Sequence, residues 1–143
     1  MTKKPTLEDL IEGLNVDLAG EYAAVIQYRT YASAVTGPYR PDLREFFAAE
    51  IVDELVHAEM LADKIIALGG KPTMIPAATK MTDDPKQMLQ NSLDDEIAAI
   101  KRYIERRAQA EALEEAGLAI GLDDLIADET KHRDELRLML KRW

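Results

Sequence analysis

Both histidines of the chain stand three residues after a glutamate, in the segments Glu54–His57 and Glu129–His132. A further glutamate lies 33 residues before the glutamate of each segment, Glu21 in the first case and Glu96 in the second. Residues three apart lie on one face of a helix, so each segment can present a carboxylate and an imidazole to one metal ion. Oxygen-rich ligation with one nitrogen per metal suits iron or manganese better than a structural zinc.

These residues belong to an internal repeat. A shift of 75 residues superimposes Glu21 on Glu96, Tyr28 on Tyr103, Asp53 on Asp128, Glu54 on Glu129 and His57 on His132. Duplication of a plain helical hairpin would produce a repeat, but it would not explain why both histidines keep both spacings. The pattern therefore predicts a site for two metal ions.

Four helices account for the sequence between its turn signals. We expect them at about 7–36, 41–68, 85–116 and 122–141, with Thr6 as the first N-cap and the last turn near Gly121. The stretch 71–84 contains prolines and threonines without a helical period, and it is the only long connection. It predicts a crossover along the bundle. The expected fold is all-α, an up-down-down-up four-helix bundle forming a single domain over residues 1–143.

Each expected helix carries one glutamate within its apolar stripe, near the middle of its length. These residues are Glu21, Glu54, Glu96 and Glu129. In a bundle of this kind, the four carboxylates converge at one height. Uncompensated charges in a core cost several kcal/mol each, and we expect no lysine or arginine in the stripes beside them. Two divalent cations would balance the four carboxylates and leave two neutral imidazoles as further ligands.

Composition limits the classes of function. The chain has 143 residues, 47% of them hydrophobic, and no cysteine, which excludes disulfides and thiolate metal sites. The net charge of −9 argues against nucleic acid as the main partner and favours the approach of cations. The start Met1–Pro5 lacks the apolar run of a signal peptide, and no 18-residue apolar stretch predicts a membrane span. We expect a cytoplasmic protein.

The residues around the candidate ligands resemble those of the ferritin-like di-iron carboxylate proteins, and those of bacterioferritins most of all. The resemblance extends from Leu7 to Leu140. Its motifs are Glu21 with Tyr28, the segment Glu50–His57, Glu96 with Tyr103, and the segment Asp128–His132.

The resemblance implies two iron ions and a role for each matching residue. The six ligands would be Glu21, Glu54, His57, Glu96, Glu129 and His132. Glu54 and Glu129 would bridge the metals, and the other four would each bind one of them. Tyr28 would be an electron donor or hydrogen-bond partner in catalysis, with Tyr103 as its counterpart. Asp53 and Asp128 would either support the ligands or be ordinary exposed carboxylates.

The sequence also departs from the bacterioferritin pattern. Leu55 stands where bacterioferritins have the methionine that binds haem, so we predict no haem. No fifth helix follows Leu140, which argues against a 24-subunit storage cage. The resemblance implies a homodimer or a larger homo-oligomer. Tyr31, Tyr39 and Phe46 are candidates for an exposed interface.

The functional prediction is a di-iron ferroxidase that binds two Fe(II) ions and oxidises them with dioxygen or peroxide, for iron detoxification or storage. An alternative is a rubrerythrin-like peroxidase or another di-iron or dimanganese oxidoreductase, which would need a substrate pocket beside the metals. A further alternative is a helical interaction module whose metal is only structural.

Overall fold

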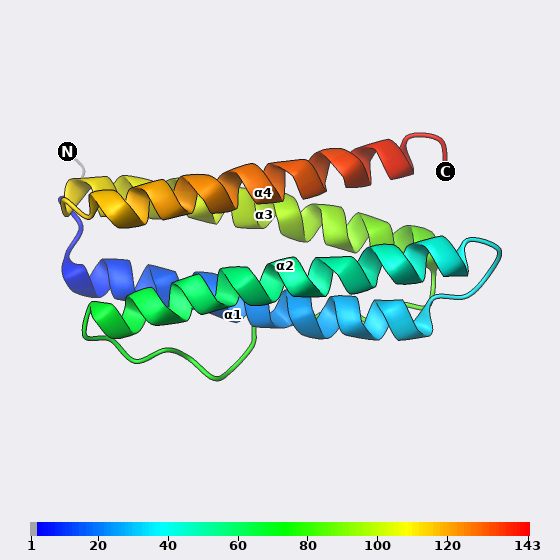
Figure 1. The fold of residues 1–143 in the computed structure, drawn as a ribbon, viewed down its shortest axis with the longest axis horizontal. Helices are drawn as coiled ribbons and strands as arrows, with labels where there is room; N and C mark the ends of the chain where they lie inside the picture. Colours follow the sequence, from blue (N-terminus) through cyan, green and yellow to red (C-terminus); the bar gives the residue numbers. More distant parts are fainter. Residues whose placement is uncertain (1–2) are drawn as a thin grey trace.

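The computed structural model describes residues 3–143, so Met1 and Thr2, part of the start in which we expect no signal peptide, lie outside it. Four helices make up the bundle: α1 (Leu7–Ala34), α2 (Arg40–Ala67), α3 (Pro85–Ala112) and α4 (Ala116–Leu140). Figure 1 shows α1 and α4 running in one direction and α2 and α3 in the other, which confirms the up-down-down-up bundle. None of these helices is long and apolar enough to cross a membrane.

The helix starts follow the signals in the sequence. Thr6 and Asp9 form a reciprocal capping box at the start of α1. Pro41 lies in the first turn of α2, and Pro85 opens α3 after the N-cap Asp84. These residues set where α1, α2 and α3 begin, and thereby the height at which the mid-helix glutamate of each lies.

The turn between the last two helices is not where we expected it. It spans residues 113–115, and Gly117 and Gly121 lie inside α4. Glu114 makes the turn by adopting a left-handed φ of 60°, a conformation in which a glycine is more usual. Gly121 serves packing instead, because a Cβ there would lie 2.9 Å from Cε of Met60 on α2.

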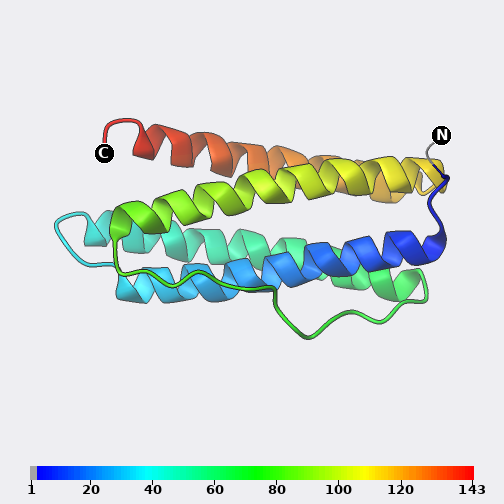
Figure 2. The ribbon, with the colours of Figure 1, turned by 180° about the vertical axis from the view of Figure 1, so that it is seen from behind.

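The crossover (residues 68–84) is held against α1 by hydrogen bonds along its length. Asn15 accepts from the backbone N–H of Thr73 at 2.8 Å, and the N–H of Ala77 donates to the carbonyl of Ala19 at 2.9 Å. Farther on, the N–H of Lys80 donates to Gln27 at 2.7 Å. Figure 2 shows the crossover reaching α1 near its middle and continuing to the start of α3.

Two hydrophobic clusters fill the bundle on either side of its middle. One is built around Leu14, Leu61 and Leu122, and the other around Phe47, Leu89 and Leu136. Tyr31 belongs to the second cluster and is fully buried, so its assignment as an exposed interface residue is wrong. Its hydroxyl donates to the carbonyl of Lys80 and accepts from Asn91 at 3.0 Å.

Candidate metal centre

The mid-helix glutamates and both histidines meet between the two hydrophobic clusters. They form two groups, and within each group one potential ligand atom per residue lies within 4.8 Å of the others. The first group contains Glu21, Glu54, His57 and Glu129, and the second contains Glu50, Glu54, Glu96 and His132. All six predicted ligands are therefore brought together, and Glu50 joins them.

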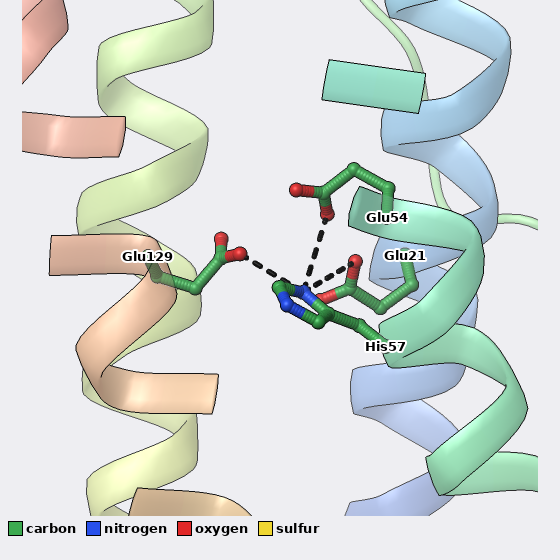
Figure 3. A group of neighbouring side chains, drawn as sticks. All are labelled: Glu21, Glu54, His57 and Glu129. Carbon is green, nitrogen blue, oxygen red and sulfur yellow. Dashed lines mark ion pairs between the residues drawn. The ribbon is translucent and has the colours of Figure 1, made fainter. Parts of the chain in front are cut away.

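In the first group, three carboxylates from three helices surround Nδ1 of His57 (Figure 3). The nitrogen lies 3.0 Å from Oε1 of Glu129, 3.8 Å from Oε2 of Glu21 and 4.0 Å from Oε2 of Glu54. Only 1% of the His57 side chain is exposed. This half of the site is consequently closed off from solvent around its imidazole.

In the second group, the nearest carboxylate to the imidazole is one that we did not predict as a ligand. Nδ1 of His132 lies 2.9 Å from Oε2 of Glu50, and 3.6 to 3.7 Å from oxygens of Glu54, Glu96 and Glu129. Glu54 and Glu129 thus approach both histidines. That placement is the one expected of carboxylates shared between two metals.

Glu50 could have been found from its helical position. It lies one turn before Glu54 on the buried side of α2, and it is 7% exposed. Comparison of the two repeats did not reveal Glu50 as a ligand, because the position 75 residues later is Leu125. A search that required the same ligands in both halves therefore excluded the residue that makes the halves different.

Each histidine is supported from behind by an aspartate of the other half. Nε2 of His57 lies 3.1 Å from Oδ2 of Asp128, and Nε2 of His132 lies 3.1 Å from Oδ2 of Asp53. An N–H donated to a carboxylate fixes the tautomer, so that Nδ1 is free to bind a metal. The two aspartates are half-exposed, yet their hydrogen bonds give them a specific role in orienting the imidazoles.

The two repeat-related tyrosines also reach across the repeat. The hydroxyl of Tyr28 donates to Oε1 of Glu96 at 2.8 Å, and the hydroxyl of Tyr103 donates to Oε1 of Glu21. Burial raises the pKa of each phenol well above its usual value, and the neighbouring carboxylates raise it further. Both phenols therefore stay protonated and can act as hydrogen-bond donors to the glutamates.

Protons neutralise part of the site in the absence of metal. Burial on its own would lower the pKa of His57 and of His132, but the surrounding carboxylates outweigh it and raise both values to about 11. Burial also raises the pKa of Glu54 and of Glu129 well above the usual range. The two imidazoles carry protons at neutral pH, so metal ions must displace these protons to bind.

The polar atoms of the site are short of partners in a way that fits metal ions. Among the described residues, eight buried side-chain nitrogen and oxygen atoms have no hydrogen-bond partner, and seven of them belong to the metal centre. The seven come from Glu21, Glu50, Glu54, His57, Glu96, Glu129 and His132. Several approach one another closely without the alignment of a hydrogen bond, and such unpaired buried groups are costly. Cations between them would remove that cost.

A cavity of about 310 Å³ opens onto the centre from the seam between α1 and α3. Glu21, Glu54, Glu96 and Glu129 form its floor, and Ala77 and Ala78 of the crossover border it. Arg102 lines the same cavity from a partly exposed position on α3, outside the apolar stripe that carries Glu96. The site is therefore accessible to a small molecule.

A bundle with paired Glu-His groups in its core is the architecture of the di-iron carboxylate proteins. The family model of the ferritin-like domain matches residues 11–143, and the chain belongs to this ferritin family. It is 29% identical to a bacterioferritin of Streptomyces coelicolor over 133 residues, which are 92% of this chain and 80% of the relative.

Two solved structures are similar along almost their whole length. A ferritin-like di-iron carboxylate protein from Bacillus anthracis has a TM-score of 0.93 and 47% identity, with 98% of this chain and 99% of that chain covered. A dodecameric thioferritin related to bacterioferritin, from Bacteroides fragilis, has a TM-score of 0.87 and 26% identity, with 96% and 88% covered.

Proposed function

We propose that the protein is a ferroxidase, which binds two Fe(II) ions and passes their electrons to dioxygen or peroxide. The observation that carries this proposal is the set of seven unpaired buried ligand atoms within two adjoining groups. Two electrons and two protons convert dioxygen to hydrogen peroxide, or hydrogen peroxide to two waters. A pair of iron ions can supply both electrons in one event.

The residues of the chain have separate tasks in this proposal. Glu54 and Glu129 hold the two iron ions together, because each approaches both histidines. Glu21 and His57 bind one ion, and Glu96 and His132 bind the other, with Glu50 as an additional carboxylate on the second. Tyr28 donates a hydrogen bond that holds Glu96 in place, and it is our candidate for an electron donor.

The similarity to the Bacillus anthracis di-iron protein and to bacterioferritin supports iron as the metal. The dodecameric relative supports a homo-oligomer. Our prediction that haem is absent continues to rest on Leu55, which is 51% exposed on α2.

The test is the initial rate of Fe(II) oxidation under air, followed by absorbance, in the wild type, Glu54→Ala and Glu59→Ala. Glu59 is an exposed glutamate on the same helix and serves as the matched control. We expect Glu54→Ala to lose the reaction and Glu59→Ala to keep it. Equal rates in wild type and Glu54→Ala would remove the proposal.

The cavity favours one second candidate, an oxidoreductase that acts on peroxide with an electron donor other than Fe(II). Its volume of about 310 Å³ is at the lower end of the range for ligand pockets. Repeated peroxide consumption with an organic donor, or catalase activity with manganese, would support this candidate. Oxidation of two Fe(II) ions for each peroxide consumed, with no further consumption of peroxide once Fe(II) is exhausted, would support the ferroxidase.

A further inference from the structure

The cavity in the α1–α3 seam is built from both halves of the repeat. Its lining contains four pairs of identical residues that are 75 positions apart: Glu21 and Glu96, Ala23 and Ala98, Ala24 and Ala99, and Glu54 and Glu129. The alanines keep the opening wide, and the glutamates form the floor. Most of the lining thus follows from duplication of one hairpin.

Two positions break this symmetry, and both change the charge. Gln27 on α1 corresponds to Arg102 on α3, and Gly20 on α1 corresponds to Asp95 on α3. Arg102 lies beside Gly20, where a Cβ would be 2.5 Å from a terminal guanidinium nitrogen of Arg102. Asp95 lies beside Gln27. One end of the cavity therefore carries a cation, and the other carries an anion.

The anionic end is already neutralised. Asp95 pairs with Lys80 of the crossover at 2.8 Å and accepts a hydrogen bond from Nε2 of Gln27 at 2.7 Å. A ligand at this end would have to displace one of these partners. We therefore do not expect a cation to bind there.

At the cationic end, the positive charge is only partly compensated by acidic side chains. Its acidic partner is the fully buried Asp17, which lies 2.8 Å from Nε of Arg106 and 3.4 Å from Nε of Arg102. One carboxylate thus serves two guanidinium groups, and it lies nearer to Arg106. Nε of Arg102 is buried without a hydrogen-bond partner. Among the residues that the structure describes, Asp17 is the only one that forms an ion pair with Arg102, although Glu21 lines the same cavity.

We propose that the Arg102 end of the cavity binds a small oxyanion beside the metal centre, with a carboxylate of one to four carbons as the best fit. A guanidinium presents parallel N–H donors that match the two oxygens of a carboxylate. The alanine walls accept a short apolar chain, and the volume excludes large acids. The site would place such an anion within the same cavity that opens onto Glu21 and Glu96.

The test is titration calorimetry of the metal-containing protein with acetate, hydrogencarbonate and phosphate, and with neutral acetamide as a ligand control. We expect saturable binding of one acetate per chain and none of acetamide. Stronger binding of hydrogencarbonate or phosphate would identify an inorganic oxyanion as the ligand. Saturation by none of the three anions would overturn the proposal.

Three variants locate the binding. Arg102→Gln installs the residue of the repeat-related position, and we expect acetate affinity to fall at least about tenfold. Gly20→Ala should weaken binding as well, because the added methyl group displaces the guanidinium. Arg107→Gln is the control, since Arg107 lies on the same helix but pairs with Asp123 at 2.7 Å, and neither residue lines the cavity.

Metal content and thermal unfolding are measured for each variant alongside the titrations. An acetate bound only to the metals would have the same affinity in Arg102→Gln and wild type, and this result would overturn the proposal. Loss of affinity in Arg102→Gln with unchanged metal content would establish Arg102 as part of the site. This outcome does not depend on whether the metals oxidise Fe(II).

Discussion

His57 and His132 occupy equivalent positions in the repeat, but they differ in their surroundings. The His57 side chain is 1% exposed and is surrounded by three carboxylates, whereas His132 is 11% exposed and has Glu50 as an additional neighbour at 2.9 Å. The position equivalent to Glu50 in the second half of the chain is Leu125, which is buried. Duplication therefore provided the shared ligands, and single substitutions made the two metal positions unequal. We expect the His132 position to bind and release its metal faster.

The largest effect is expected from removing a carboxylate that both metal positions share. Glu129→Ala takes away a carboxylate that approaches both imidazoles, at 3.0 Å from His57 and 3.7 Å from His132. We expect the rate of Fe(II) oxidation to fall at least about 100-fold, above the range for groups that only support a ligand. Metal analysis should find fewer than two ions per chain. Retention of two tightly bound ions would contradict the sharing of Glu129.

A smaller effect should follow from the aspartates that support the histidines. Asp128→Asn replaces the charged acceptor behind His57 with a neutral amide, and Asp53→Asn does the same behind His132. Each should weaken one metal position by about 10- to 100-fold, the range seen for hydrogen-bond partners of ligands. Metal titration of the two variants measures this effect. Because the contacts cross the repeat, Asp128→Asn should affect the metal bound by the first half, and an effect on the other metal would contradict this geometry.

The pH dependence of metal binding tests both halves together. His57 and His132 have a pKa of about 11 without metal, so each binds a metal only after losing a proton. Metal affinity should rise by about tenfold per pH unit for each proton displaced between pH 6 and 8. Proton release can be measured in weakly buffered solution. Metal binding that is independent of pH would show that the metals do not displace protons from the two imidazoles.

The same pKa values determine how the metal-free protein responds to pH. The folded-state pKa of each histidine lies above its unfolded value, so the stabilisation is fully present below pH 6.5 and is lost as pH rises towards 11. The metal-free protein should therefore lose thermal stability across this range. The metal-bound protein should lose less, because its imidazoles are already neutral.

A further variant removes Glu50, the carboxylate that makes the two metal positions different. Glu50→Leu installs the residue that the second half of the chain has at the equivalent position, Leu125. We expect a change of about tenfold or less in the affinity of the His132 position, because the other carboxylates there remain within 3.7 Å of the imidazole. The two metal affinities should become more similar. Stepwise metal titration of the variant and wild type measures this, and an unchanged ratio would mean that Glu50 does not contact the metal.

The extent to which the site could be predicted follows from the repeat. Residues that occur in both halves, such as Glu21 with Glu96, were recognised by their spacing. Glu50 was not, because a single carboxylate in an apolar stripe has no equivalent against which to test it. Asp17 and Arg106 were also missed, because each compensates the other's charge within the core and neither residue alone reveals the pair.

The helices were predictable where a capping residue or a proline marks their start, as at Thr6 and Pro85. The turn at residues 113–115 was not, because a glutamate adopts the conformation for which a glycine is the usual signal. Gly121 suggested a turn, but it lies inside α4, where the lack of a side chain allows the helix to approach Met60 closely. Glycine marks both kinds of position, and the sequence does not distinguish a turn from a close helix contact.

The smallest expected effect compares the tyrosines, which are equivalent in position and in contact. Tyr28→Phe and Tyr103→Phe each remove one hydrogen bond to a glutamate, from Glu96 and Glu21 respectively. If the phenols only position these carboxylates, the two variants should slow Fe(II) oxidation equally, by about 3- to 10-fold. If Tyr28 also donates an electron, only Tyr28→Phe should abolish the transient phenoxyl radical signal in electron paramagnetic resonance. Because Tyr28 lines the cavity and Tyr103 does not, the radical signal, rather than a difference in rate, distinguishes electron transfer from positioning of the ligands.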